Sequence, residues 1–194
     1  MRKLAYLFLA VLLSGILTTA CKEKTAVSPD NGTDSICEEE LDTTVYGICG
    51  EGTTMHNLEL ITNDGDTLNL AVNVDDSDTD VVKGGLLSGD KLAVIVTDIY
   101  GEKTAGIVLN LTTLEGKWTS LDRNFEIVDG GEVLSTVQRE TNPYTSWKIH
   151  NGKLLMGRDS FDVVSFGADS LELENSKGIF VYKRQKQVTS RNIK

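Results

Sequence analysis

Short segments in which apolar and polar residues alternate, separated by turn-forming residues, are the feature that most constrains the fold of this chain. They recur from residue 43 to residue 185 and are interrupted by Gly, Asn and Asp. Alternation places apolar side chains on one face of a β-strand, and Gly, Asn and Asp accommodate tight turns. The pattern predicts an all-β fold built from antiparallel strands.

Residues 43–112 contain five predicted strands. They are "TVYGICG" (44–50), "NLELIT" (57–62), "TLNLAVNV" (67–74), "GGLLSGDKLAVIVTD" (84–98) and "KTAGIVLNL" (103–111), with an Asp-Gly hairpin signal between the second and the third. This arrangement resembles a small OB-like β-barrel. Because OB-like barrels also bind oligosaccharides or proteins, the resemblance does not decide between these two classes of ligand. The region has only Tyr46 and Tyr100 as aromatic residues and few Lys, so it is poorly suited to stacking nucleic-acid bases.

An acidic stretch, "DDSDTD" at 75–80, interrupts this first region. Carboxylates at alternate positions could in principle bind Ca²⁺, but the Gly and the final Glu of an EF-hand loop are missing. We therefore expect a solvated acidic loop and no metal site.

Residues 113–185 predict a second β-barrel, of six or seven short strands. Its clearest hairpin signal is "WKIHNGKLLM" at 147–156. The Asn-Gly pair at 151–152 is typical of a tight turn and should pair residues 147–149 with 153–155.

The stretch "GKW" at 116–118 resembles the G-x-W signature of lipocalins. The resemblance implies that Gly116 and Trp118 lie at the closed end of the barrel, with Lys183 or Arg184 of the last strand stacked on the indole. Such a cation–π contact contributes roughly 0.5 to 2 kcal/mol. The resemblance covers residues 114–184. The chain looks similar in this respect to lipocalin-like lipoproteins of the Bacteroidetes, with a more remote likeness to the NlpE-type envelope lipoproteins, whose barrels come in the reverse order.

Eight aromatic residues lie in this second region: Trp118, Phe125, Tyr144, Trp147, Phe161, Phe166, Phe180 and Tyr182. A barrel of six or seven short strands is more often filled by such rings than hollow, since about eight strands are needed to leave room for a small ligand. We expect a packed core. If a cavity exists, Trp147, Phe161 and Phe180 are the candidates for its lining.

The N-terminus predicts export and lipid anchoring. Arg2 and Lys3 precede an apolar run and the small residues before Cys21, so residues 1–20 are interpreted as a signal peptide. "LTTAC" resembles a bacterial lipobox, which implies acylation of Cys21, a membrane anchor through that lipid and an outer-membrane location. Residues 21–42 are a flexible tether and residues 186–194 a polar tail. The alternatives are ordinary secretion and, for the apolar run, a membrane-spanning helix, although the run is shorter than the about 20 residues that spanning needs.

Two cysteines remain if Cys21 is acylated. In an exported protein, Cys37 and Cys49 are best interpreted as a disulfide. Free thiols, or a thiolate metal site completed by His56, are the alternatives, although no C-x-x-C spacing is present.

Charge and motif content favour a binding protein over an enzyme. The formal net charge of −10 becomes −12 once Arg2 and Lys3 are removed, which opposes binding of nucleic acid. No nucleophile, phosphate-binding or zinc-protease motif accompanies the two His, so we expect no catalytic residues and no cofactor. The predicted role is non-enzymatic binding of a small apolar molecule or an envelope protein. The alternatives are a structural or stress-sensing lipoprotein, or a glycan hydrolase if two carboxylates face each other across a cleft.

Overall fold

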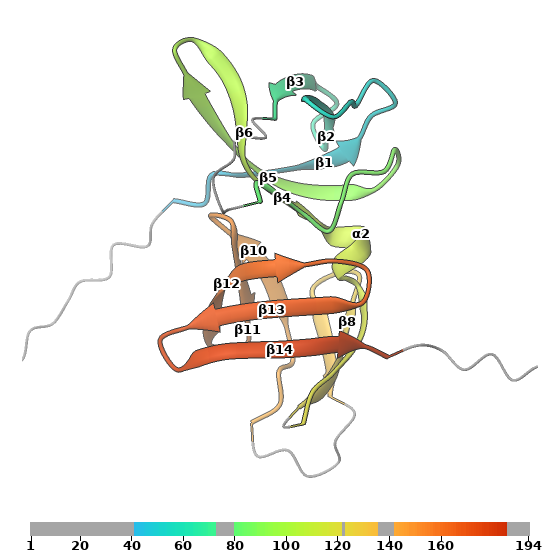
Figure 1. Ribbon diagram of the computed structural model, residues 1–194, viewed down its shortest axis with the longest axis vertical. Coiled ribbons are helices and arrows are strands. Elements are labelled where there is room, and N and C mark those ends of the chain that lie inside the picture. The colour runs from blue at the N-terminus through green and yellow to red at the C-terminus, as the bar shows by residue number, and fades with distance from the viewer. Residues whose placement is uncertain (1–40, 73–79, 122, 136–141, 186–194) are drawn as a thin grey trace, which may run out of the picture. The chain divides into compact units, whose positions relative to one another are not determined.

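The computed structural model describes residues 41–72, 80–121, 123–135 and 142–185 (Figure 1). Among these residues the regular elements are β-strands, apart from one helix of four residues, and the strands form two sheets. The predicted all-β, barrel-like fold is therefore confirmed. All the described residues belong to one compact unit.

The first sheet forms a small barrel. Its strands are β1 (Thr44–Cys49), β2 (Asn57–Thr62), β3 (Thr67–Ala71), β4 (Val82–Lys83), β5 (Lys91–Ile99) and β6 (Glu102–Asn110). They are ordered β3-β2-β1-β5-β6-β4, and a parallel pairing of Ala71 in β3 with Thr104 in β6 closes the sheet on itself. Apolar side chains that alternate along these strands, such as Leu58, Leu60 and Leu70, are fully buried inside.

The predicted strand 84–98 was placed too early in the chain, because β5 begins only at Lys91. Gly84 and Gly89 have φ values of +90° and +91°, which a β-strand does not use. The short strand β4 instead precedes these glycines and pairs in parallel with β6.

The second sheet contains eight strands. They are β7 (Gly116–Thr119), β8 (Asn124–Val128), β9 (Glu132–Ser135), β10 (Trp147–His150), β11 (Lys153–Met156), β12 (Asp159–Phe166), β13 (Ser170–Asn175) and β14 (Gly178–Arg184). The prediction of six or seven strands was too low, because the stretches around Trp118 and Phe125 form separate, antiparallel strands, with a hydrogen bond of 2.9 Å from Ser120 N to Arg123 O beyond their paired ends.

Pairing in this second sheet follows chain order almost all the way round. Consecutive strands pair from β7 to β9 and from β10 to β14, and β14 returns to pair with β7. A bridge between Glu132 and Ser146, with a hydrogen bond of 2.8 Å from Trp147 N to Gly131 O, joins β9 to the start of β10. The sheet is therefore a nearly closed, up-and-down barrel.

The predicted Asn-Gly hairpin is confirmed. Asn151 and Gly152 have φ values of 48° and 76°, as a tight primed turn requires, and they connect β10 to β11. The register pairs Trp147 with Met156 and His150 with Lys153.

Aromatic rings fill the inside of the second barrel. Phe125 meets Tyr182 edge to face with ring centroids 5.0 Å apart, and Phe161 meets Phe180 at 5.7 Å. Tyr144 contacts both Phe125 and Phe161, so these rings form a continuous packed chain. Edge-to-face pairs of this kind contribute about 0.5 to 1.5 kcal/mol beyond the area they bury.

The two barrels share apolar packing. Leu92, Ala93 and Val94 are consecutive in β5, and all three are buried. Leu92 and Val94 pack in the first barrel, whereas Ala93 belongs to the cluster that fills the second barrel, as does Leu109 of β6. Both faces of β5 are therefore covered, which explains its unbroken apolar sequence.

Helix α2 (Leu111–Leu114) connects the barrels. Its N-cap is Asn110, whose side-chain oxygen accepts a hydrogen bond of 2.8 Å from Thr113 N. The amide nitrogen of the same side chain donates to Asp90 at 2.6 Å and to the Gly85 carbonyl at 3.0 Å. The buried Asn110 thus fixes both the helix and the loop before β5.

Residues 41–44 are held against the β10–β11 turn by a group of hydrogen bonds. Asp42 Oδ1 accepts from Thr44 N at 3.0 Å and from Asn151 N at 3.2 Å. Asn151 Oδ1 accepts from Thr43 N at 2.8 Å, and His150 Nδ1 lies 3.4 Å from the Asp42 carboxylate. Burial alone would raise the pKa of Asp42, but the hydrogen bonds from Thr44 and Asn151, together with His150, lower it to about 2.

We expect Asp42 to stabilise the fold above about pH 4 and to lose that effect as the pH falls toward 2. A carboxyl whose pKa is lower in the folded than in the unfolded chain stabilises only while it is ionised. The Asp42 side chain is 37% exposed, so the effect should be no more than about 1 kcal/mol. Denaturant unfolding of Asp42→Asn should show this deficit at pH 6 and a much smaller one at pH 2. Asp64→Asn, in the exposed β2–β3 turn, is the control, and a deficit independent of pH would contradict the assignment.

Candidate binding sites

Trp118 and Arg184 close one end of the second barrel. Trp118 is 1% exposed, and its Nε1 donates a hydrogen bond of 2.8 Å to the Leu114 carbonyl of α2. Trp118 and Arg184 are partners in the β7–β14 register, and the guanidinium carbon of Arg184 lies 4.3 Å from the centre of the indole. Of the two basic residues considered from the sequence, Arg184 is the one that stacks on the ring.

Arg184 also binds main-chain oxygens from two other segments. It donates to the Ala168 carbonyl at 2.5 Å, to the Glu115 carbonyl at 2.9 Å and to the Thr113 carbonyl. Burial lowers the pKa of Arg184, partly offset by the nearby Asp169. Gly116 lies directly beside the guanidinium. Because its donors are engaged with the protein itself, we interpret this group as a structural clasp rather than a ligand site.

Trp147, Phe161 and Phe180, the residues expected to line any cavity, lie in the core of the second barrel. Phe161 is 1% exposed, and Trp147 and Phe180 pack against the same apolar cluster. The Trp147 Nε1 donates a hydrogen bond of 2.8 Å to the Val128 carbonyl. None of the three lines either of the two pockets described next.

The first pocket, called here the apolar pocket, lies in the first barrel. It has a volume of about 500 Å³ and is lined by Thr53, Thr54, Met55, Val72, Val82 and Leu86. The three residues 53–55 come from the β1–β2 connection, where Thr53 Oγ1 accepts a hydrogen bond of 3.1 Å from Glu59 N. The Met55 side chain is 78% exposed, so a large apolar group stands open to solvent at this pocket.

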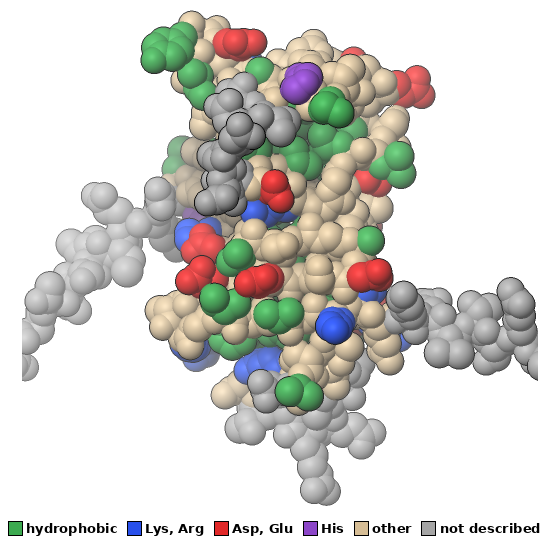
Figure 2. Space-filling model, viewed as in Figure 1, with side chains coloured by type: hydrophobic (Ala, Val, Ile, Leu, Met, Phe, Trp, Pro, Cys, Tyr) green, Lys and Arg blue, Asp and Glu red, His purple; other side chains and the backbone are tan. Residues whose placement is uncertain are grey.

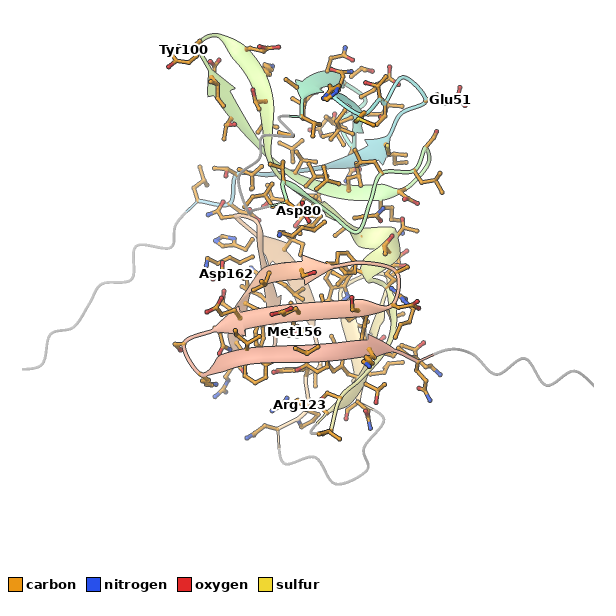
Figure 3. All side chains as sticks on the ribbon, in the orientation of Figure 1. Glu51, Asp80, Tyr100, Arg123, Met156 and Asp162 are labelled. Atoms are coloured by element: carbon orange, nitrogen blue, oxygen red, sulfur yellow. The ribbon has the colours of Figure 1, made fainter. Side chains whose placement is uncertain are left out.

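The second pocket, called here the basic pocket, lies at one end of the second barrel. Its volume is about 610 Å³, and its lining comprises Arg123, Asn142, Pro143, Tyr144, Thr145, Gly157, Arg158, Asp159 and Lys177. The β7–β8, β11–β12 and β13–β14 turns contribute to it, and alternate turns of an up-and-down barrel lie at the same end. Arg123 is at the end of the barrel away from α2 (Figure 3).

Sequence analysis did not identify either pocket. Arg123, Arg158 and Lys177 each lie in a turn between consecutive strands, where a basic residue is ordinarily interpreted as a solvated one. What they share is that their connections lie at the same end of the barrel. This can be recognised only once the strand order is known.

The predicted lipidation and disulfide cannot be placed. Cys21 and Cys37 lie outside the described residues, so the acylation and the Cys37–Cys49 pairing stay predictions. Cys49 is buried, with its Sγ 3.4 Å from Thr53 Oγ1. The acidic stretch 75–80 also lies outside, except for Asp80.

In the described part of the chain, no three or more His, Cys, Asp or Glu side chains are grouped so that they could hold a metal ion. None of its helices has the length and apolar character needed to cross a membrane.

Compared with known proteins, the chain matches no protein-family model, no curated protein and no solved structure. Its function has to be argued from its own residues.

Proposed function

We propose that this protein is a lipid-anchored lipoprotein of the cell envelope that binds a small apolar molecule without catalysing a reaction, and that the apolar pocket is its binding site. The observation that carries the proposal is the set of aliphatic side chains of Met55, Val72, Val82 and Leu86 around a pocket of about 500 Å³. Small-molecule sites are mostly apolar clefts of about 300 to 1,000 Å³ with a few polar groups.

The polar part of the pocket suits this role. Thr53 and Thr54 belong to its lining, and their backbone groups are already fixed, with Thr54 N donating to the Asn57 carbonyl at 2.8 Å. This polar part of the wall is therefore held by hydrogen bonds before a ligand arrives, which reduces the entropic cost of binding there. Anchoring rests on the sequence "LTTAC" and on acylation of Cys21.

The filled interior of the second barrel supports a second candidate function. With rings packed inside and Trp118 and Arg184 closing one end, this barrel resembles a solid structural element. A structural or stress-sensing envelope lipoprotein would act through protein contacts and hold no small molecule.

Native mass spectrometry distinguishes the two functions. Residues 22–194, exported without the anchor and purified from the periplasm, should carry a noncovalent excess mass that disappears on denaturation. Met55→Glu should abolish that mass, because it places a charge beside the aliphatic lining, while the exposed position of Met55 preserves the fold. Leu87→Glu, at a residue that is 70% exposed but does not line the pocket, is the matched control and should retain the ligand.

A bare mass for the unaltered protein would contradict the binding of a tightly held molecule and favour the structural function. If both Met55→Glu and Leu87→Glu lost the ligand, the loss would have to be attributed to the added negative charge and not to a change in the pocket.

A further inference from the structure

We propose that the basic pocket is a binding site for small organic oxyanions, carboxylates or phosphates, and that Arg158 is the residue that recognises the anionic group. This site is separate from the apolar pocket, because the two have no lining residue in common.

The charge of the basic pocket is opposite to that of the whole chain. The described residues that line it include three basic side chains and one acidic one, whereas the chain has a formal net charge of −10. On the face shown in Figure 2, Lys and Arg side chains lie mainly over the second barrel. A concave site with excess positive charge concentrates anions that the remaining surface repels.

Asp159, the acidic residue among the described residues that line the pocket, is already paired. Lys177 Nζ lies 2.6 Å from Asp159 Oδ1, and the Asp159 side chain is 28% exposed. Lys177 therefore offsets the repulsion that this carboxylate would exert on an incoming anion. Arg158 is left to supply the attraction for the anion.

Arg123 is held in a fixed position at the edge of the pocket. Its guanidinium carbon lies 4.4 Å from the centre of the Tyr144 ring, and Nη1 donates to the Asn142 carbonyl at 3.3 Å. The side chain contributes positive charge there without having to be ordered on binding.

Arg158 is exposed and makes no hydrogen bond or ion pair with the part of the chain that the structure describes. It lies at the β11–β12 turn, next to the Asp159–Lys177 pair. A guanidinium presents planar, parallel donors that match the two oxygens of a carboxylate or phosphate. The pocket volume of about 610 Å³ suits an anion carried by a small organic molecule.

The test uses the full chain in a non-ionic detergent and three water-soluble probes: benzoate, phenyl phosphate and the neutral benzamide. Isothermal titration and ligand-observed NMR should detect both anions and show much weaker binding of benzamide. Arg158→Gln should weaken binding of the two anions at least about ten-fold, as expected for the loss of charge-assisted hydrogen bonds.

Lys103→Gln is the matched control, since it makes the same change of charge at an exposed position of β6 outside the pocket. It should leave anion binding unchanged within about two-fold. Equal affinities in the two Gln variants would overturn the proposal, because net charge alone would then explain binding. Benzamide binding as tightly as benzoate, or no anion binding at about 10 mM, would overturn it as well. The anion-binding test concerns only the basic pocket, so its outcome is independent of the mass measurement with Met55→Glu, which tests the apolar pocket.

Discussion

Trp118→Ala is expected to lower the free energy of unfolding by about 3 to 5 kcal/mol, one of the two largest effects of any single substitution considered for this protein. Removal of a buried indole loses its transfer free energy and leaves a cavity. The Leu114 carbonyl also loses its hydrogen bond from Nε1, and the Arg184 guanidinium loses the ring under it. Thermal unfolding should begin about 10 °C lower or more.

Two further variants separate the causes. Trp118→Phe keeps an aromatic ring but not the N–H donor, and we expect it to lose about half as much stability. Tyr100→Ala removes an aromatic side chain that is fully exposed at the β5–β6 turn (Figure 3), so its effect should be within about 0.5 kcal/mol. A Trp118→Ala deficit as small as that of Tyr100→Ala would mean that the indole does not close the barrel.

Local sequence pattern was sufficient to predict most strands and one hairpin. The alternating residues around Asn151 and Gly152 specify both the turn and the faces of β10 and β11, and the register follows from them. The contact between Trp118 and a basic residue near the C-terminus was expected only from the resemblance of "GKW" to the lipocalin signature, and in the structure it joins the first and last strands of the second barrel.

Features that depend on two surfaces meeting could not be predicted in the same way. The unbroken apolar run in β5 indicates burial on both faces, but it does not say that Ala93 packs in the second barrel while Leu92 and Val94 pack in the first. The pockets were missed for a related reason. Met55 and Leu86 are brought together by the closure of the first barrel, and no local motif marks them.

The glycine-rich stretch before β5 was misinterpreted as part of the strand because an apolar Leu-Leu pair follows Gly85. Positive φ angles at the flanking glycines turn the chain there, so Leu87 is 70% exposed instead of pairing in the sheet. The pattern of apolar and polar side chains does not indicate the φ angle that a glycine adopts, so this turn could not be predicted from it.

The second large effect is expected from Gly116→Ala. Gly116 has a φ of +133°, a conformation that residues with a Cβ rarely adopt, and an added Cβ would overlap Nη1 of Arg184. The guanidinium cannot move away freely, because the Thr113, Glu115 and Ala168 carbonyls hold it. We expect a loss of about 3 to 4 kcal/mol, measured by denaturant unfolding.

Gly178→Ala is a close control for backbone strain. Gly178 has a φ of +136°, but a Cβ added there would have no neighbour within 4 Å. It should cost only about 1 to 2 kcal/mol, so the difference between the two alanine variants measures the displacement of Arg184. In an Arg184→Ala background that difference should disappear, since residues in contact are energetically coupled. If Gly116→Ala remained more costly than Gly178→Ala without Arg184, the guanidinium would not be the cause, and the clasp that joins α2, β7 and β14 would have to depend on other contacts.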